Sequence, residues 1–276
     1  LMRKQGLAKA DKKAARVAAE GVIVIERAPD GQAAAMVEIN CETDFVARES
    51  DFRAFSQAVA AKALVARPAS LEALLEQRLD SGETIDERRR ALVAKIGEKL
   101  SVRRFAVLSA AGQSNAGQST AAGQSNAGQI SAYVHGTRIG ALVAIEGGDA
   151  ALAHDIAMHV AASNPKYLSL AEVPAQVVAK EREILTEQAM GEGKPPQIVA
   201  KMVEGRLRKS LGALTLSGQA FVKDPDQTIE KLLKSAKAGV LAFERFEVGA
   251  GIEKKQDDFV AEVMAQVKSF DPGTEK

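Results

Sequence analysis

The stretch VIVIERAPDGQAAAMVEI, residues 22–39, decides how this chain begins to fold. Two apolar runs, 22–25 and 33–39, flank the turn-forming tripeptide Pro-Asp-Gly at 29–31. Apolar runs separated by such residues are typical of a β-hairpin. We therefore expect two antiparallel strands here, which begin a sheet.

Helical patterns follow this hairpin. Ser50 is suited to cap a helix whose buried face has residues at helical spacing: Phe52, Phe55, Val59 and Ala63. Thr84 and Glu87 form a capping box, which predicts a second helix near 85–99. Residues 102–108 then provide a third strand for the same sheet.

The same order of elements recurs later in the chain. Apolar runs at 131–134 and 141–145 surround a turn at 135–140 and predict two more strands. A helical pattern follows at about 149–163, and Pro165 ends it. Strand, turn, strand and helix thus occur twice, which indicates two halves of similar plan.

A near-repeat separates these halves. AAGQSNAGQST at 110–120 is followed by AAGQSNAGQIS at 121–131. Such a small, polar tract cannot bury a core, and two copies are too few for a repeat fold. We expect a flexible insert.

The last third of the chain predicts a helical hairpin. Helical segments at 171–190 and 197–210 are joined by GEGKPP at 191–196. Their apolar residues would form the seam between antiparallel arms: Ile184, Leu185, Ile198, Val199, Met202 and Val203. A late strand at 241–248 and a terminal helix complete the chain.

The expected fold class is α+β, with two similar sheet-plus-helix core subdomains, a protruding antiparallel helical hairpin and a C-terminal helix. The expected domains are a basic linker helix at 1–20, the core N-subdomain at 21–108, the insert at 109–129, the first part of the core C-subdomain at 130–178, the hairpin at 179–222, the second part of the C-subdomain at 223–255 and the terminal helix at 256–276.

Composition excludes several classes of protein. Lys and Arg total 37 against 36 Asp and Glu, so no strong field favours nucleic acid or membrane. No run approaches 18 apolar residues, which argues against a membrane-spanning helix. The single cysteine, Cys41, cannot form an internal disulfide, and charges interrupt the first 20 residues where a signal peptide would be apolar. We expect a cytoplasmic protein.

The sequence offers little for catalysis or metal binding. The chain has three histidines, His135, His154 and His159, and the step between the last two does not match metalloprotease spacing. GEGK at 191–194 lacks the spacing of a phosphate loop, and Pro195 stands where that motif needs Ser or Thr. We expect no metal site and no cofactor.

Two other functions stay open on the residues alone. An enzyme could use Cys41 with Glu42 or Asp44, but no histidine lies nearby in sequence to activate the thiol. An RNA-binding module could use the basic helix at 1–20, although aromatics are only 4% of the chain and leave few surfaces on which bases could stack.

The segment NCETDFVA, residues 40–47, combines an acidic and a large aromatic residue at a strand-to-helix junction. In one interpretation, Thr43 or Asp44 caps a helix and Phe45 fills the core. In the other, the junction contacts another molecule, as such loops often do.

NCETDFVA and five further segments resemble the bacterial elongation factor Ts family. They occur in family order over nearly the whole chain: KKAARVAAEG at 12–21, HGTRIG at 135–140, IAMHVAAS at 156–163, KMVEGR at 201–206 and RFEVGAGIEK at 245–254. The chain departs from the family in two respects. The family's small N-terminal three-helix domain is expected to be missing before Leu1, and the AGQSN tract looks like an added loop.

The resemblance implies a guanine nucleotide exchange factor rather than an enzyme. Its partner would be the GTPase elongation factor Tu, in GDP-bound and nucleotide-free forms, and it would promote GDP release by disturbing the magnesium and phosphate site. It implies these partner-binding residues: Thr43, Asp44, Phe45, Val46, Ile139, Gly140 and His159. We also expect possible self-association through the helical hairpin.

Overall fold

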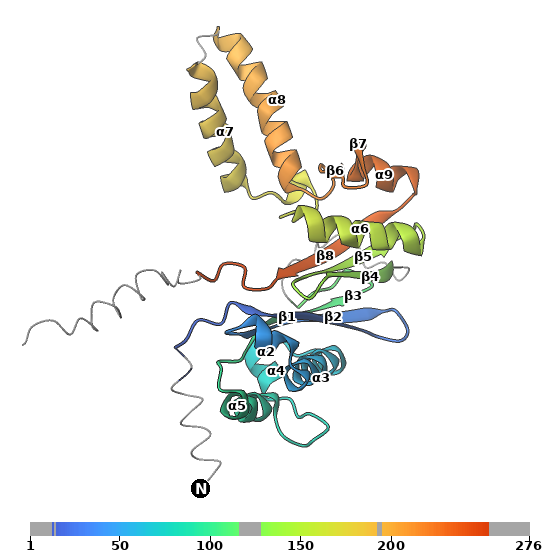
Figure 1. The fold of residues 1–276 in the computed structure, drawn as a ribbon. Coiled ribbons are helices and arrows are strands. Elements are labelled where there is room, and N and C mark those ends of the chain that lie inside the picture. Colours follow the sequence, from blue (N-terminus) through green and yellow to red (C-terminus); the bar gives the residue numbers. More distant parts are fainter. Residues whose placement is uncertain (1–12, 14, 116–127, 192–194, 254–276) are drawn as a thin grey trace, which may run out of the picture.

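The computed structural model describes residues 13, 15–115, 128–191 and 195–253. Two three-stranded antiparallel sheets lie face to face, helices cover the outer side of each, and a helical hairpin projects away from them (Figure 1). The expected α+β fold class is confirmed.

The first sheet has the order β1-β2-β3 and is antiparallel throughout. Its strands are β1 (Glu20–Arg27), β2 (Ala33–Cys41) and β3 (Ser101–Ser109). The predicted hairpin is confirmed, and a hydrogen bond from Ala28 N–H to Ala33 O (2.9 Å) closes its turn. Every residue of the central strand β2 is buried, because helices cover one face of the sheet and the second sheet covers the other.

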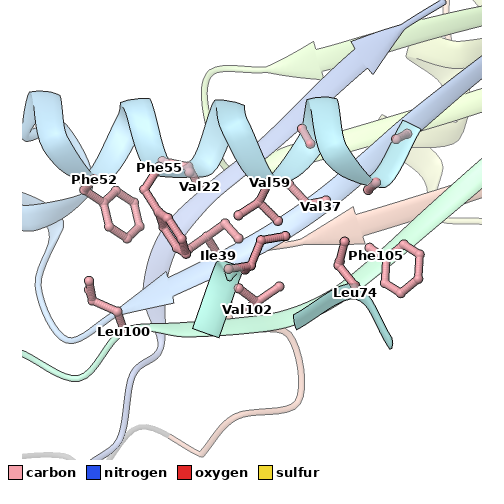
Figure 2. Packing of buried hydrophobic residues seen from close by; sticks show 14 of the residues in the cluster. Val22, Val37, Ile39, Phe52, Phe55, Val59, Leu74, Leu100, Val102 and Phe105 are labelled. Carbon is pink, nitrogen blue, oxygen red and sulfur yellow. The ribbon is translucent and has the colours of Figure 1, made fainter. Parts of the chain in front are cut away.

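Four helices cover the outer face of this sheet (Figure 1). They are α2 (Asp44–Arg48), α3 (Ser50–Ala66), α4 (Leu71–Leu75) and α5 (Ile85–Ile96). The predicted buried face of α3 is confirmed. Figure 2 shows it packed on residues of the sheet and of neighbouring segments, with these labelled: Phe52, Phe55, Val59, Val22, Val37, Ile39, Leu74, Leu100, Val102 and Phe105.

Two predicted helix boundaries need correction. Glu49, not Ser50, is the N-cap residue of α3, since the extended Glu49 separates α2 from α3 and Ser50 is already helical. The capping box of Thr84 and Glu87 is confirmed, but α5 stops earlier than expected. Gly97 ends it by adopting a left-handed conformation with φ of 89°.

The second sheet repeats this plan. Its strands, in the order β4-β5-β8, are β4 (Gly128–His135), β5 (Ile139–Glu146) and β8 (Gly239–Glu247). Helix α6 (Ala150–Ser163) covers the outer face, and the Asp149 side chain caps it. Each half therefore contains a β-hairpin, a helical layer and a third strand that pairs with the second.

The sheets meet through a tightly packed apolar layer. A Cβ added at Gly140 would lie 2.6 Å from Ile23 Cγ2 and 2.8 Å from Met36 Sδ, so only glycine fits there without a shift. The fully buried Glu38 carboxylate pairs with Arg103 and Arg104 within the first half, and it accepts a hydrogen bond from Gly249 N–H (2.8 Å), which follows β8 of the second half. The apolar layer and this hydrogen bond join the halves into one body.

The helical hairpin consists of α7 (Ala175–Met190) and α8 (Pro196–Leu214). A short 3-10 turn and Pro174 precede α7, so it begins after residue 171. The seam is partly as predicted. Its buried residues are Leu185, Ala189, Val199, Val203, Leu207 and Leu211, whereas Ile184 and Ile198 are exposed.

Three short elements were not expected from the sequence: β6 (Ala220–Phe221), β7 (Asp224–Thr228) and α9 (Ile229–Ser235). The start of the insert is part of the folded core, because Ser114 Oγ donates to the buried Glu244 carboxylate (2.6 Å) and Asn115 Oδ1 accepts from Val107 N–H (2.6 Å). Positions 109–115 of the predicted insert are thus folded, positions 128–129 begin β4, and residues 116–127 lie outside the described residues. Residues 1–12 and 14 of the predicted linker helix and the whole predicted terminal helix also lie outside the described residues. Residues 15–19 are not helical and Glu20 begins β1, so the predicted linker helix does not reach residue 20. The domain boundaries stay predictions.

Candidate functional site

The acidic-aromatic loop, residues 42–46, joins β2 to α2 and includes the first turn of that helix, residues 44–46. Thr43 is the N-cap, and its Oγ1 accepts a hydrogen bond from Val46 N–H (3.4 Å). Val46 is buried, whereas the Phe45 side chain is 76% exposed. The interpretation of Phe45 as a core residue is therefore wrong, and the cap is Thr43 rather than Asp44.

A charged side chain lies next to this exposed ring, and hydrogen bonds hold the backbone beneath it. Asp44 is also exposed and forms an ion pair with Arg48 one turn later (2.9 Å), which leaves its carboxylate accessible from solvent. Beneath the loop, the Glu98 carboxylate accepts hydrogen bonds from Glu42 and Thr43. An exposed carboxylate and an exposed aromatic ring thus lie next to each other on a backbone segment that Glu98 holds in place. This arrangement is suited to contact with another molecule.

Cys41 lies directly before the loop but is poorly suited to nucleophilic catalysis. It is fully buried, and its thiol donates a hydrogen bond to Thr43 O (3.1 Å). Burial, followed by the negative charges of Glu98 and Glu20, raises its pKa to about 12. Near neutral pH the thiol stays protonated, whereas the thiolate is the reactive form.

The other predicted site residues belong to the second half. Ile139, half-buried, begins β5, and Gly140 packs against the first sheet as described above. The His159 ring is fully buried: its Nε2 lies 3.0 Å from Gln219 Oε1, and its Nδ1 accepts from Val222 N–H (3.2 Å). The structure therefore groups Thr43 to Val46 on one loop, and it places Gly140 and His159 inside the fold rather than on its surface.

Sequence reasoning missed Glu98. A glycine that ends a predicted helix often takes a left-handed conformation and reverses the chain. Gly97 carries that signal, but nothing in the sequence shows that the next side chain, Glu98, would contact the loop at residues 42–46.

Among the described residues, no group of three or more His, Cys, Asp or Glu is arranged to hold a metal ion. Within the same part of the chain, no helix is long and apolar enough to cross a membrane.

Comparison with known proteins identifies the family. The family model described as Elongation factor TS matches residues 42–250. The chain is 55% identical to Elongation factor Ts of Methylococcus capsulatus over 98% of its own length and 87% of that protein. It is 50% identical to the Elongation factor Ts proteins of Alkalilimnicola ehrlichii and of Legionella pneumophila strain Philadelphia 1, over 97% of this chain and 86% of each relative.

The two stacked α+β halves with their exposed loop are thus those of a translation elongation factor. More specifically, the chain belongs to the elongation factor Ts family.

Proposed function

We propose that this protein binds elongation factor Tu in its GDP-bound form and acts as its guanine nucleotide exchange factor. The observation that carries the proposal is the exposed Phe45 ring beside Asp44 on an anchored loop, within a member of the elongation factor Ts family. Aromatic side chains of this kind are the usual anchors of protein interfaces.

The mechanism follows from how a GTPase holds GDP. The nucleotide is bound through its phosphates and through Mg²⁺, which demands a nearly ideal octahedral set of ligands. A ring inserted beside this site, with a carboxylate next to it, would displace the groups that position the ion. Phe45 would act as the wedge and Asp44 as the competing acid, while Thr43 and Val46 frame them.

Exchange of this kind needs no bond to be made or broken by the chain. It is a coupling between two binding sites on Tu. The factor by which the chain weakens the binding of GDP to Tu therefore equals the factor by which GDP weakens the binding of the chain to Tu. Rebinding of nucleotide then displaces the chain from its partner.

Ile139, Gly140 and His159 would support a second contact with another domain of Tu. Because Gly140 and the His159 ring are buried, we propose that they act by shaping the surface above them. Val222, whose N–H is held by His159, is one exposed residue on that surface.

The test replaces each exposed residue of the loop. Phe45→Ala should slow GDP release from Tu by about ten- to a hundredfold, since burial of a Phe in a partner's pocket is worth roughly 1.5–3 kcal/mol. Asp44→Ala should also slow it. Release of a fluorescent GDP analogue is followed by stopped flow.

Val65→Ala is the matched control, because Val65 is a similarly exposed apolar side chain (79%) on α3. All three variants should melt close to the wild type, since exposed side chains contribute little to stability. Wild-type release rates from stably folded Phe45→Ala and Asp44→Ala proteins would overturn the mechanism.

A further inference from the structure

The segment that follows α5 lies directly under the acidic-aromatic loop. Gly97 turns the chain back at the end of α5 and brings Glu98 to the loop. Glu98 Oε2 accepts hydrogen bonds from Glu42 N–H (3.1 Å) and Thr43 N–H (3.0 Å). Glu98 Oε1 accepts from the Thr43 hydroxyl (2.7 Å). Both carboxylate oxygens are therefore used to hold two consecutive residues.

The connection is reciprocal. Glu42 Oε1 accepts a hydrogen bond from Lys99 N–H (2.6 Å), so each segment binds the backbone of the other through a glutamate. Cys41 adds a hydrogen bond to Thr43 O from below (3.1 Å). These contacts fix the backbone on the N-terminal side of Asp44 and Phe45.

Glu98 also determines how Thr43 caps the helix. A hydroxyl group has one proton to donate and lone pairs with which to accept. The Thr43 hydroxyl donates its proton to Glu98, which leaves a lone pair for Val46 N–H, the cap contact of α2. Because α2 has only five residues, it is too short to be stable by itself and depends on such contacts.

We propose that Glu98 is a positioning residue for exchange: it holds Thr43, and through it the direction in which Asp44 and Phe45 are presented. This inference rests on the proposed function. A side chain that must enter a partner's pocket binds better when it is ordered beforehand, because less conformational freedom is lost on binding. Glu98 itself need not touch the partner.

The first test concerns the free protein. Glu98→Gln keeps the shape but replaces one acceptor oxygen with an NH₂ group, which cannot accept from the loop. Amide hydrogen exchange at Thr43 and Val46 should accelerate about tenfold, while Leu92 in the centre of α5 keeps its wild-type rate. Glu49→Gln, the matched control, removes the same charge just after α2 at a side chain that makes no cap hydrogen bond, and should leave these rates unchanged.

The second test measures GDP release from Tu as a function of factor concentration. Glu98→Gln should lower the maximal rate about tenfold and change the half-saturating concentration less than about twofold, because other contacts still bind Tu. A merely structural role would instead lower the fraction of folded protein, which raises the apparent half-saturating concentration and leaves the maximal rate unchanged. Thr43→Val removes the same hydroxyl hydrogen bond from the other side and should reproduce the effect if Glu98→Gln fails to fold.

The outcomes separate the two proposals. Unchanged amide exchange at Thr43, or faster amide exchange with wild-type GDP release, would overturn the role of Glu98 while Phe45→Ala remains defective. Wild-type GDP release from Phe45→Ala would overturn both the proposed function and the positioning role. Loss of local protection together with a lower maximal rate supports the inference.

Discussion

The buried ring of His159 accepts a hydrogen bond from a backbone N–H, which has consequences for its protonation. Because Val222 N–H can only donate, His159 Nδ1 must accept, and Nε2 carries the proton toward Gln219. Burial lowers the pKa of His159 from its ordinary value of 6.5, against a smaller raising effect of the hydrogen bond to Gln219. The folded protein therefore holds this ring neutral.

This predicts a pH dependence of stability. Below pH 6.5, His159 is protonated in the unfolded chain but stays neutral in the folded protein, because its pKa there is lower. The unfolding free energy should therefore fall as the pH decreases from 6.5 toward the lowered pKa of the folded state. His159→Gln should flatten this part of the curve and lower stability at pH 8 by about 1 kcal/mol through lost hydrogen bonds. Urea unfolding between pH 5 and 8 measures it. An identical slope in the variant would contradict the prediction.

At the scale of single residues, the sequence indicated the capping box at Thr84 and the unusual composition around Asp44 and Phe45. It left open whether Phe45 points inward or outward, because a strand-to-helix junction has no periodicity from which a buried side can be inferred. The burial of His159 and the role of Glu98 depend on side chains far apart in sequence, which no local pattern encodes.

The packing of the helical hairpin predicts that it can be removed without unfolding the rest of the protein. Its buried residues pack mainly on one another, and its base is closed by hydrogen bonds from Lys166 N–H to Leu214 O (2.8 Å) and from Leu216 N–H to Tyr167 O (2.8 Å). Replacing residues 172–212 with a short Gly-Ser linker keeps both bonds. Thermal melts should show the remaining core stable, and GDP release from Tu should persist.

The same variant tests self-association, which we propose for the exposed apolar residues of the hairpin, including Met190 and Ile198. Sedimentation of the full chain should show a larger species at high concentration that the shortened chain lacks. A folded hairpin-deleted protein that releases no GDP would disprove the peripheral role of this element.

At the scale of elements, long periodic segments were predicted well, and the strands and helices of both halves were found near their expected positions. Helix starts were less accurate, because Glu49 and Pro174 set them through backbone conformation rather than hydrophobic pattern. The short β6, β7 and α9 escaped notice, since segments of two to seven residues carry too little periodicity.

At the scale of the whole molecule, two buried glutamates, one in each half, have pKa values shifted in opposite directions. Burial raises the pKa of Glu38, but hydrogen bonds from Gly249 N–H and Arg103, with the charge of Arg104, outweigh it and lower the pKa below 4.5. Burial raises the pKa of Glu244 above 4.5, and its contacts with Ser114 and Arg104 lower it only in part. Ionised Glu38 therefore stabilises the fold above about pH 4.5, and this contribution is lost as the pH falls through its lowered pKa.

Glu38→Gln should thus lower the unfolding free energy at pH 7 by about 2–4 kcal/mol, since it leaves two arginines without their buried partner. Glu244→Gln is the matched control and should cost less than about 1 kcal/mol, because it removes a charge that burial disfavours. Urea unfolding at pH 7 compares them. Equal losses in the two variants would contradict the stabilising role of ionised Glu38.

The position of β8 has a consequence for how the protein is made. The first sheet is built from one continuous part of the chain and can form as soon as that part leaves the ribosome. The second cannot, because β5 receives its partner β8 only after the helical hairpin has been synthesised. Until then the edge of β5 offers unpaired backbone groups, which is the condition under which nascent chains aggregate. A chain that stops before residue 239 would keep that edge open.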